Sequence, residues 1–260
     1  MPLQAPSPLF DLSGRSAVVI GAGSTLGRMM AEALVAHGAH VALVVRNPDK
    51  AATDLQPLLD TGKARMFKAD AVSKPELQQA LLEIVEWTGR VDILLNTAGV
   101  NSATPFFEIT EEEWDRIMDV NAKSVMLACQ VFGKAMIDGG MGGSIINISS
   151  VSSGPPLSRV FSYSASKSAL NSMTQYLARE FAPNKIRVNA IVPGFFPAEQ
   201  NRSILSPERV ASIMSHTPMN RFGDPKELQG AVVWLASEAA SSFVTGTLIR
   251  VDGGFGAVTI

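Results

Sequence analysis

Cysteine and histidine are scarce in this chain of 260 residues, and each shortage excludes a kind of chemistry. The single Cys129 lies in an apolar stretch, so an internal disulfide is impossible and a small core residue is favoured over a nucleophile. Only three histidines are present, His37, His40 and His216, and none has a cysteine or carboxylate at metal-ligand spacing. We therefore expect no metal site built by the protein.

Charge of one sign and long apolar runs are scarce as well. The net charge is -2 and no basic run stands out, so the electrostatic footprint of a nucleic-acid-binding protein is missing. No apolar run reaches membrane-spanning length, and residues 1–11 have neither the basic nor the apolar region of a signal peptide. We expect a cytoplasmic protein without nucleic-acid or membrane partners. Because 46% of the residues are hydrophobic, the chain can bury a large core.

Strand patterns and helix patterns alternate along the whole chain without a break in composition. Strands are expected over residues 16–20, 40–45, 64–70, 91–95, 144–148, 186–192 and 247–251. Helix-forming stretches separate them, which is typical of a doubly wound α/β protein. We therefore predict one domain, residues 1–260, built on a single Rossmann-type sheet of about seven parallel strands flanked by helices. Residues 195–217 are irregular and then briefly helical after a strand end, so they are the expected substrate-binding lid.

A glycine loop follows the first expected strand. Residues 21–27 read Gly-Ala-Gly-Ser-Thr-Leu-Gly, and the helix-forming stretch after them stops at Gly38. In such a unit, backbone N–H groups can approach a diphosphate at the positive end of the helix. A tight structural turn is the alternative, because a glycine pattern alone is weak evidence. The flanking strand and helix favour the nucleotide site.

The ends of the next two expected strands bear on the choice of cofactor. A dinucleotide site usually places here either a carboxylate for the ribose hydroxyls or an arginine for a 2′-phosphate. Val45 is followed by Arg46 and Asn47, with no acidic residue before Asp49, so NADP is favoured over NAD. Alternatively, Arg46 is a solvated loop residue or stacks on the adenine ring, and either arrangement is compatible with NAD. Asp70, at the tip of the third strand, would accept from the adenine amino group or cap the next helix.

A tyrosine and a lysine stand four residues apart after the fifth expected strand. Tyr163 and Lys167 fall on one face of a helix-forming stretch, and Ser150 lies in the loop that ends the strand. A nearby positive charge favours the phenolate, and a hydroxyl aimed at a developing oxyanion stabilises it. The three residues suit interconversion of a carbonyl and an alcohol. The alternative is an exposed helical pair beside an ordinary turn serine.

Two asparagines stand at positions that invite a role. Asn96 begins the sequence Asn-Thr-Ala-Gly at the end of the fourth expected strand, where small residues allow close approach of a flat ring. Equally, Asn96 would tie strand ends together. Asn121 lies within a helical stretch, where asparagine is unfavourable by propensity. We expect it to bend the helix or to hold a water molecule.

Taken together and in this order, the motifs resemble the short-chain dehydrogenase/reductase family over nearly the whole chain. The resemblance implies an NAD(P)-dependent oxidoreductase in which Tyr163 is the general acid/base and Lys167 lowers its pKa and holds the nicotinamide ribose. Ser150 would polarise the substrate carbonyl, and Asn121 would support a proton-relay water. The implied cofactor residues are Gly21, Ser24, Thr25, Leu26, Gly27, Arg46, Asn47, Asp70, Ala71, Asn96, Ala98, Gly99, Tyr163, Lys167, Pro193 and Gly194. The family habit of tetramers, with the apolar segment 243–249, implies a homotetramer.

Three positions depart from the family pattern. Thr25 replaces the middle glycine of the loop, and Thr97 replaces the second asparagine of the Asn-Asn-Ala-Gly element. Ala198 stands where many members carry a threonine that bonds the nicotinamide carboxamide. We therefore expect the diphosphate to sit differently and backbone groups of residues 191–194 to orient the ring.

The sequence of residues 193–202 is similar to sequences of the mannonate (fructuronate) oxidoreductase branch and, more loosely, to those of gluconate 5-dehydrogenases. That resemblance implies a sugar acid or polyol as the small-molecule substrate. Gln200 and Asn201 offer amides for hydroxyls and Arg202 a guanidinium for a carboxylate, with Ser150 and Ser152 also facing the substrate. Solvent-facing lid residues are the alternative. A 3-oxoacyl-[acyl-carrier-protein] reductase and a non-catalytic dinucleotide-binding protein are the other functions left open.

Overall fold

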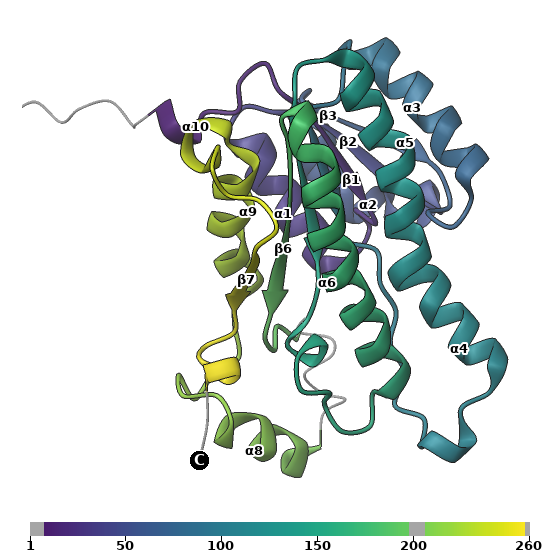
Figure 1. The fold of residues 1–260 in the computed structure, drawn as a ribbon, viewed down its shortest axis with the longest axis vertical. Helices are drawn as coiled ribbons and strands as arrows, with labels where there is room; N and C mark the ends of the chain where they lie inside the picture. Colours follow the sequence, from purple (N-terminus) through teal and green to yellow (C-terminus); the bar gives the residue numbers. More distant parts are fainter. Residues whose placement is uncertain (1–7, 198–205, 258–260) are drawn as a thin grey trace, which may run out of the picture.

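The computed structural model describes residues 8–197 and 206–257 (Figure 1). Seven strands of this part of the chain form one parallel sheet in the order β3-β2-β1-β4-β5-β6-β7. The strands are β1 Ser16–Ile20, β2 His40–Val45, β3 Ala64–Lys68, β4 Ile93–Asn96, β5 Gly143–Ile148, β6 Ile186–Pro193 and β7 Leu248–Val251. The predicted doubly wound sheet is confirmed. Only strand ends differ; β4, for example, begins at Ile93 rather than at Val91.

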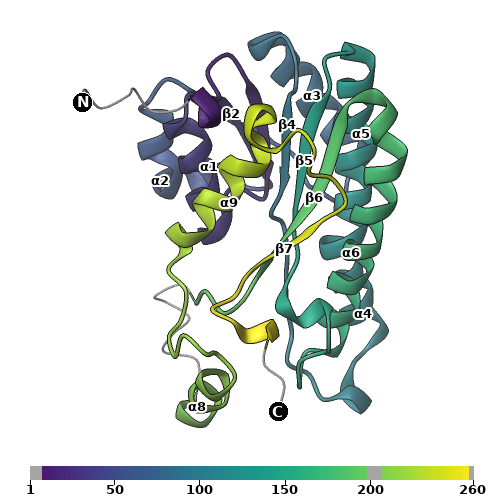
Figure 2. The same ribbon diagram turned by 60° about the vertical axis from the view of Figure 1, so that its left-hand side comes forward.

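Helices cover both faces of the sheet (Figure 2). One face carries α1 Thr25–Ala36, α2 Pro48–Leu59 and α9 Gln229–Ala236, and the other carries α3 Lys74–Thr88, α5 Ser124–Gly139 and α6 Phe161–Phe181. Successive residues of β1 point to opposite faces, so Val19 lies in the apolar core under the first group and Val18 in the core under the second. Because both faces are covered, the central strands are apolar at nearly every position.

The strand order of the sheet reverses between β1 and β4: β1 to β3 extend to one side, and β4 to β7 extend to the other. β1 pairs with β2 on one side and with β4 on the other. Open α/β sheets bind ligands beyond the strand ends at such a switch point. Ile20, Asn96 and Ile148 end β1, β4 and β5 at this edge. The loops that follow these three residues therefore carry the candidate site.

The long helical segment after β4 is interrupted at Asn121. Helix α4 Glu111–Met118 is followed by a π-helical turn, Asp119–Lys123, before α5 begins. Asn121 lies in this turn and is fully buried. A π-helical turn widens the helix locally and is frequent at functional sites. The structure thus has a departure from regular helix at the asparagine for which the sequence predicted a special role.

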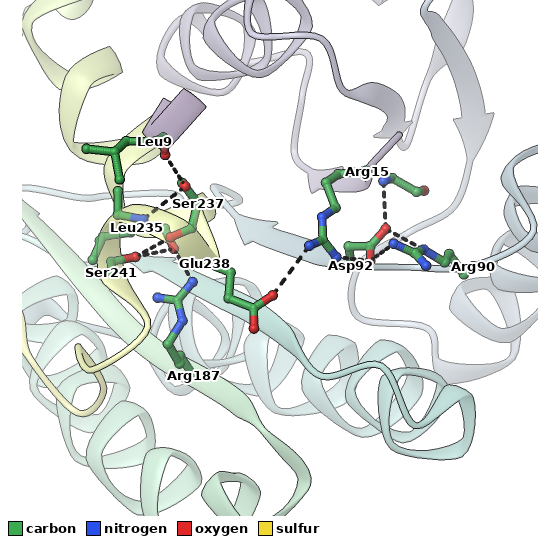
Figure 3. Close-up of polar contacts among 11 residues, drawn as sticks. Leu9, Arg15, Arg90, Asp92, Arg187, Leu235, Ser237, Glu238 and Ser241 are labelled. Carbon is green, nitrogen blue, oxygen red and sulfur yellow. Dashed lines mark hydrogen bonds and ion pairs between the residues drawn. The ribbon is translucent and has the colours of Figure 1, made fainter. Parts of the chain in front are cut away.

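A polar cluster closes the opposite, amino-terminal edge of the sheet (Figure 3). Asp92, just before β4, accepts from Arg15 at 3.2 Å, from Arg90 at 2.8 Å and from the backbone N–H of Ser16 at 2.9 Å. Glu238, the first residue of the short helix α10 Glu238–Ser241, lies 3.4 Å from the Arg15 guanidinium. Because Asp92 is buried, removing its partners would leave an uncompensated charge. The cluster therefore fastens β1, β4 and α10 together, far from the candidate site.

The structure also bears on the cysteine, on metal ligands and on membrane-spanning helices. Cys129 is buried on α5, and burial raises the pKa of its thiol to about 12, which agrees with a core residue. Across residues 8–197 and 206–257, no three His, Cys, Asp or Glu side chains come together as metal ligands would. None of the helices in that part of the chain combines the length and apolarity needed to cross a membrane.

Candidate active site

Ser150, Tyr163 and Lys167 come together beyond the end of β5. Lys167 is buried, and its Nζ donates to the carbonyl of Ile148, the last residue of β5, at 2.8 Å. The same Nζ lies 5.7 Å from the centroid of the Tyr163 ring. Ser150 lies close enough to Tyr163 to act on its pKa, and it caps the short turn that follows β5. The strand end thus positions all three side chains in one place.

Burial shifts the pKa values of the tyrosine and the lysine in opposite directions. It raises the pKa of Tyr163 above its ordinary value, and the hydrogen bond with Ser150 acts against this rise. Burial lowers the pKa of Lys167 to about 8. Lys167 is not among the causes of this shift, so the lowering of the Tyr163 pKa by the lysine stays a prediction. Low dielectric favours the neutral form of both groups.

Asn121 connects the fourth strand's loop to the helix that carries the tyrosine. Its Oδ1 accepts from the backbone N–H of Val100 at 2.8 Å, and its Nδ2 donates to the Val100 carbonyl at 2.9 Å and to Ser166 Oγ at 2.9 Å. A Cβ on Gly99 would lie 3.5 Å from Asn121 Oδ1 and 3.6 Å from Lys167 Nζ. All four residues predicted as catalytic therefore lie at the carboxyl edge of the sheet.

Ser152 was expected to face the substrate together with Ser150. In the structure Ser152 is fully buried, and its Oγ and backbone N–H lie 3.1 and 3.2 Å from Ser150 Oγ. The Ser152 N–H and the Ser152 hydroxyl both donate to the Ser150 oxygen. Ser152 therefore orients the Ser150 hydroxyl rather than presenting its own to the open side of the site.

The glycine loop is shaped by close backbone approaches. Gly21 has a φ of +83°, and a Cβ there would lie 2.7 Å from the Ala98 nitrogen. A Cβ on Gly27 would lie 2.5 Å from the Gly21 carbonyl oxygen. Helix α1 begins at Thr25, earlier than expected, because Ser24 caps it by accepting from the Gly27 N–H at 3.0 Å. The last three residues of the loop therefore form the first turn of α1, whose free N–H groups suit a diphosphate.

A cleft of about 550 Å³ runs from this loop over the ends of β2 and β3 to the end of β4. Its lining includes eight of the predicted cofactor residues: Gly21, Ser24, Arg46, Asn47, Asp70, Ala71, Ala98 and Gly99. Size, glycine loop and polar rim fit a dinucleotide. Lys50 also lines the cleft and was missed by sequence reasoning. The signal for it was Asn47, which caps α2 by accepting from the Lys50 N–H at 3.1 Å and so places position 50 next to Arg46.

For other predicted cofactor residues, the structure shows side-chain or backbone contacts that the sequence alone did not decide. Asn96 is buried, and its Nδ2 donates to Asn147 Oδ1 at 2.9 Å, so its side chain ties β4 to β5. Asp70 does not cap α3, since Ser73 is the capping position, and its Oδ1 accepts from the Val72 N–H at 3.1 Å. A Cβ on Gly194 would lie 2.7 Å from Asp252 Cα, so this glycine permits close packing after Pro193.

The expected lid is described only in part. Gln200, Asn201 and Arg202, together with Ala198, lie outside the described residues. The later part of the lid is helix α8 Pro207–Ser215, capped by Ser206, whose Oγ accepts from the Arg209 N–H. Arg209 Nη1 donates to Ser158 Oγ at 3.2 Å. Helix α8 is therefore joined to the loop between Ser150 and Tyr163.

The fold and this set of side chains define a Rossmann-type oxidoreductase that acts with a dinucleotide. The family described as Enoyl-(Acyl carrier protein) reductase matches residues 21–256. The 5-keto-D-gluconate 5-reductase of Escherichia coli K12 is 34% identical over 95% of this chain and 97% of its own length. The chain belongs to the short-chain dehydrogenase/reductase family, and it is an oxidoreductase of CH–OH groups that uses a nicotinamide cofactor.

Solved structures agree closely with this fold. A gluconate 5-dehydrogenase from Burkholderia cenocepacia J2315, in complex with NADP and tartrate, has a TM-score of 0.91 at 33% identity and covers 96% of this chain and 98% of its own. A Haemophilus influenzae protein provisionally assigned as a D-mannonate oxidoreductase, with bound NAD, has a TM-score of 0.91 at 32% identity over 96% of this chain and 97% of its own. These relatives bear out the resemblance to the mannonate and gluconate branch.

Proposed function

We propose that this enzyme reduces the carbonyl of a sugar acid or polyol, or oxidises the corresponding secondary alcohol, with NADP preferred over NAD. The observation that carries the reaction type is the convergence of Ser150, Tyr163 and Lys167 at the end of β5, beside the cleft. The substrate class rests on the names of the similar proteins, a 5-keto-D-gluconate reductase and a gluconate 5-dehydrogenase. The cofactor preference rests on the basic residues of the cleft.

Each residue of the site has a distinct task in this proposal. The bound nicotinamide would supply or accept the hydride. The Tyr163 hydroxyl gives its proton to the carbonyl oxygen during reduction and takes it back during oxidation. Ser150 donates a hydrogen bond to the same oxygen, with its hydroxyl oriented by Ser152. Lys167 holds the nicotinamide ribose and, when charged, stabilises the phenolate. Asn121 keeps the Gly99 and Val100 backbone in place beside Lys167.

The cofactor preference is argued from charge at the end of β2. Arg46 and Lys50 both line the cleft there, whereas Asp49, the first acidic residue after β2, does not; the aspartates of the lining are Asp54 on α2 and Asp70 after β3. Two cations suit a 2′-phosphate, whereas a ribose with free hydroxyls is usually met by a carboxylate. Neither Arg46 nor Lys50 takes part in an ion pair within the described residues. Both are therefore free to meet a phosphate.

Replacing Arg46 by alanine is expected to raise KM for NADPH about tenfold, the effect of roughly 1.4 kcal/mol, while KM for NADH changes less than about twofold. The reason is that only NADPH carries the 2′-phosphate. Initial rates with each cofactor measure the change. Arg65→Ala is the matched control, because Arg65 stacks on Trp87 outside the cleft. Equal losses with NADPH and NADH would contradict the proposed phosphate contact.

The substrate is tested by following nicotinamide absorbance with NADPH and NADH in parallel, against fructuronate, 5-ketogluconate and an acetoacetyl thioester. Turnover of a keto acid supports the proposed class. The thioester is included because the matching family is described as acyl carrier protein reductases. Turnover of the thioester alone would move the function to acyl reduction. Cofactor binding without turnover of any carbonyl would favour a non-catalytic dinucleotide-binding protein.

A homotetramer of single-domain subunits in the cytoplasm is part of the proposal. β7 is an edge strand of the sheet, and Phe243, just before it, is fully exposed. An apolar edge of this kind is normally covered in the assembled protein. Residues 195–217 are proposed as the substrate-binding lid, with Gln200, Asn201 and Arg202 as its contacts to the substrate. Sedimentation equilibrium tests the assembly, and a monomer at micromolar concentration would contradict it.

A further inference from the structure

Glu113 does not make the contact that its position in the helix predicts. It is the third residue of α4, and the capping residue Thr110 accepts from its backbone N–H at 3.2 Å. In a capping box, the side chain of this third residue reaches back to the backbone of the cap. Instead, Glu113 Oε1 accepts from Ser102 Oγ and Oε2 accepts from Thr104 Oγ1, each at 2.6 Å. The carboxylate is thus committed to the chain segment that follows β4.

The segment of residues 99–106 runs along the part of α6 that bears the tyrosine. At its beginning, Gly99 approaches Lys167 Nζ, and Val100 is held by Asn121. At its end, the ring of Phe106 lies 4.9 Å, centroid to centroid, from the ring of Phe161. The segment therefore passes from residue 167 to residue 161 of α6. Tyr163 belongs to the stretch of α6 between these two contacts.

Both ends of the segment are held by packing or buried hydrogen bonds, and Glu113 holds its middle. One carboxylate that accepts from two hydroxyls two residues apart fixes both side chains in a single geometry. Hydrogen bonds to an ionised acceptor are stronger than neutral ones. The two hydroxyl donors and Arg116 lower the pKa of Glu113, so the carboxylate is charged at neutral pH. Trp114, the next residue of α4, packs on Phe161 at 5.9 Å and keeps α4 against α6.

We propose that Glu113 is a positioning residue for the carbonyl substrate: it holds residues 102–104 as a fixed wall beside Tyr163. The inference rests on the proposed reduction of a carbonyl at Tyr163. A substrate with a long polyhydroxy chain needs this wall in order to place its carbonyl, whereas a small ketone touches less of it. Glu113 contacts neither the cleft of the dinucleotide nor the reacting side chains. Its effect should therefore appear in substrate binding and not in cofactor binding.

The test compares Glu113→Ala with Glu113→Gln and with Glu112→Ala. Glu112 is the exposed neighbour on the same turn and makes no contact with residues 102–104, so its variant is the matched control. We expect Glu113→Ala to raise KM for 5-ketogluconate, or for whichever keto acid the wild type reduces, about tenfold, with kcat within about threefold. The dissociation constant of NADPH should stay within about twofold. Glu113→Gln, which keeps one acceptor oxygen, should recover part of the KM.

A double-mutant cycle locates the effect in the two hydroxyl contacts. Ser102→Ala/Thr104→Val should raise KM as Glu113→Ala does, and combining all three changes should add little further loss. An unchanged KM in Glu113→Ala would overturn the inference, as would parallel losses in kcat, cofactor binding and melting temperature, which indicate a structural role only. Absence of keto-acid turnover by the wild type would instead overturn the proposed function, and this inference with it.

Discussion

Tyr163→Phe is expected to lower kcat/KM about a thousandfold, while the dissociation constant of NADPH changes less than about twofold. The substitution removes only the hydroxyl that exchanges a proton with the carbonyl oxygen. The ring, which lies 5.7 Å from Lys167 Nζ, keeps its packing. Steady-state kinetics and a fluorescence titration with NADPH measure the two quantities separately.

Tyr176→Phe is the control for this prediction. Tyr176 is the second of the two tyrosines in the chain and lies on the same helix, α6, where it is 63% exposed. The control should keep wild-type activity. Turnover by Tyr163→Phe within a few-fold of the wild type would contradict the assigned proton transfer. Loss of both turnover and NADPH binding would point to a damaged fold instead.

Lys167→Met is expected to lower kcat about a hundredfold and, at pH 7, to make the protein more stable. The loss of activity follows because the charge that stabilises the phenolate is gone. The gain in stability follows because Lys167 is buried and its pKa is lowered to about 8. Removing a buried cation is worth on the order of 3 kcal/mol at neutral pH. The lost hydrogen bond to the Ile148 carbonyl offsets part of this gain.

The pH dependence of that stability difference has a definite sign. Below pH 8 the lysine is charged in both states, so the folded wild type carries the full cost of the buried cation. Between about pH 8 and 10.5 the unfolded chain holds a proton that the folded chain has released, so the wild-type free energy of unfolding rises with pH. The advantage of Lys167→Met should therefore shrink across this window. Denaturant unfolding of both proteins at several pH values measures it.

Lys134→Met controls for the loss of a lysine as such. Lys134 is exposed on α5 and pairs with Asp138 one turn further on. Its replacement should leave kcat unchanged and change stability by less than about 0.5 kcal/mol at any pH. If Lys167→Met were less stable than the wild type at pH 7, the free-energy cost of burying the Lys167 charge would be smaller than the contribution of its contacts, which contradicts the prediction.

The order of the strands and the place of the site follow from local signals in the sequence. Apolar runs between glycine or polar residues marked the central strands, because buried parallel strands are apolar at nearly all positions. Gly21 and Gly27 marked the loop because no other residue fits their contacts. The four-residue spacing of Tyr163 and Lys167 placed both on one helical face.

Other features depend on contacts between segments distant in sequence. The alternatives for Asn96 could be weighed but not resolved without Asn147, which receives its hydrogen bond from across the sheet. The direction of the Tyr163 pKa shift depends on burial, which spacing does not report. Glu113 occupies the third position of α4, and only the path of residues 102–104 in space reveals its contacts with Ser102 and Thr104. The polar cluster around Asp92 likewise joins elements far apart in the chain.

Hydride transfer to the substrate carbonyl is tested most directly by following the transferred hydrogen itself. The wild type is incubated with 5-ketogluconate or fructuronate and NADPH that carries deuterium at both hydrogen positions of nicotinamide C4, and the product is examined by proton and deuterium NMR. We expect deuterium at the new carbinol carbon, with the hydroxyl proton coming from solvent through Tyr163. Product formed without deuterium at that carbon, or no product from any carbonyl although NADPH is bound, would contradict hydride transfer by this enzyme.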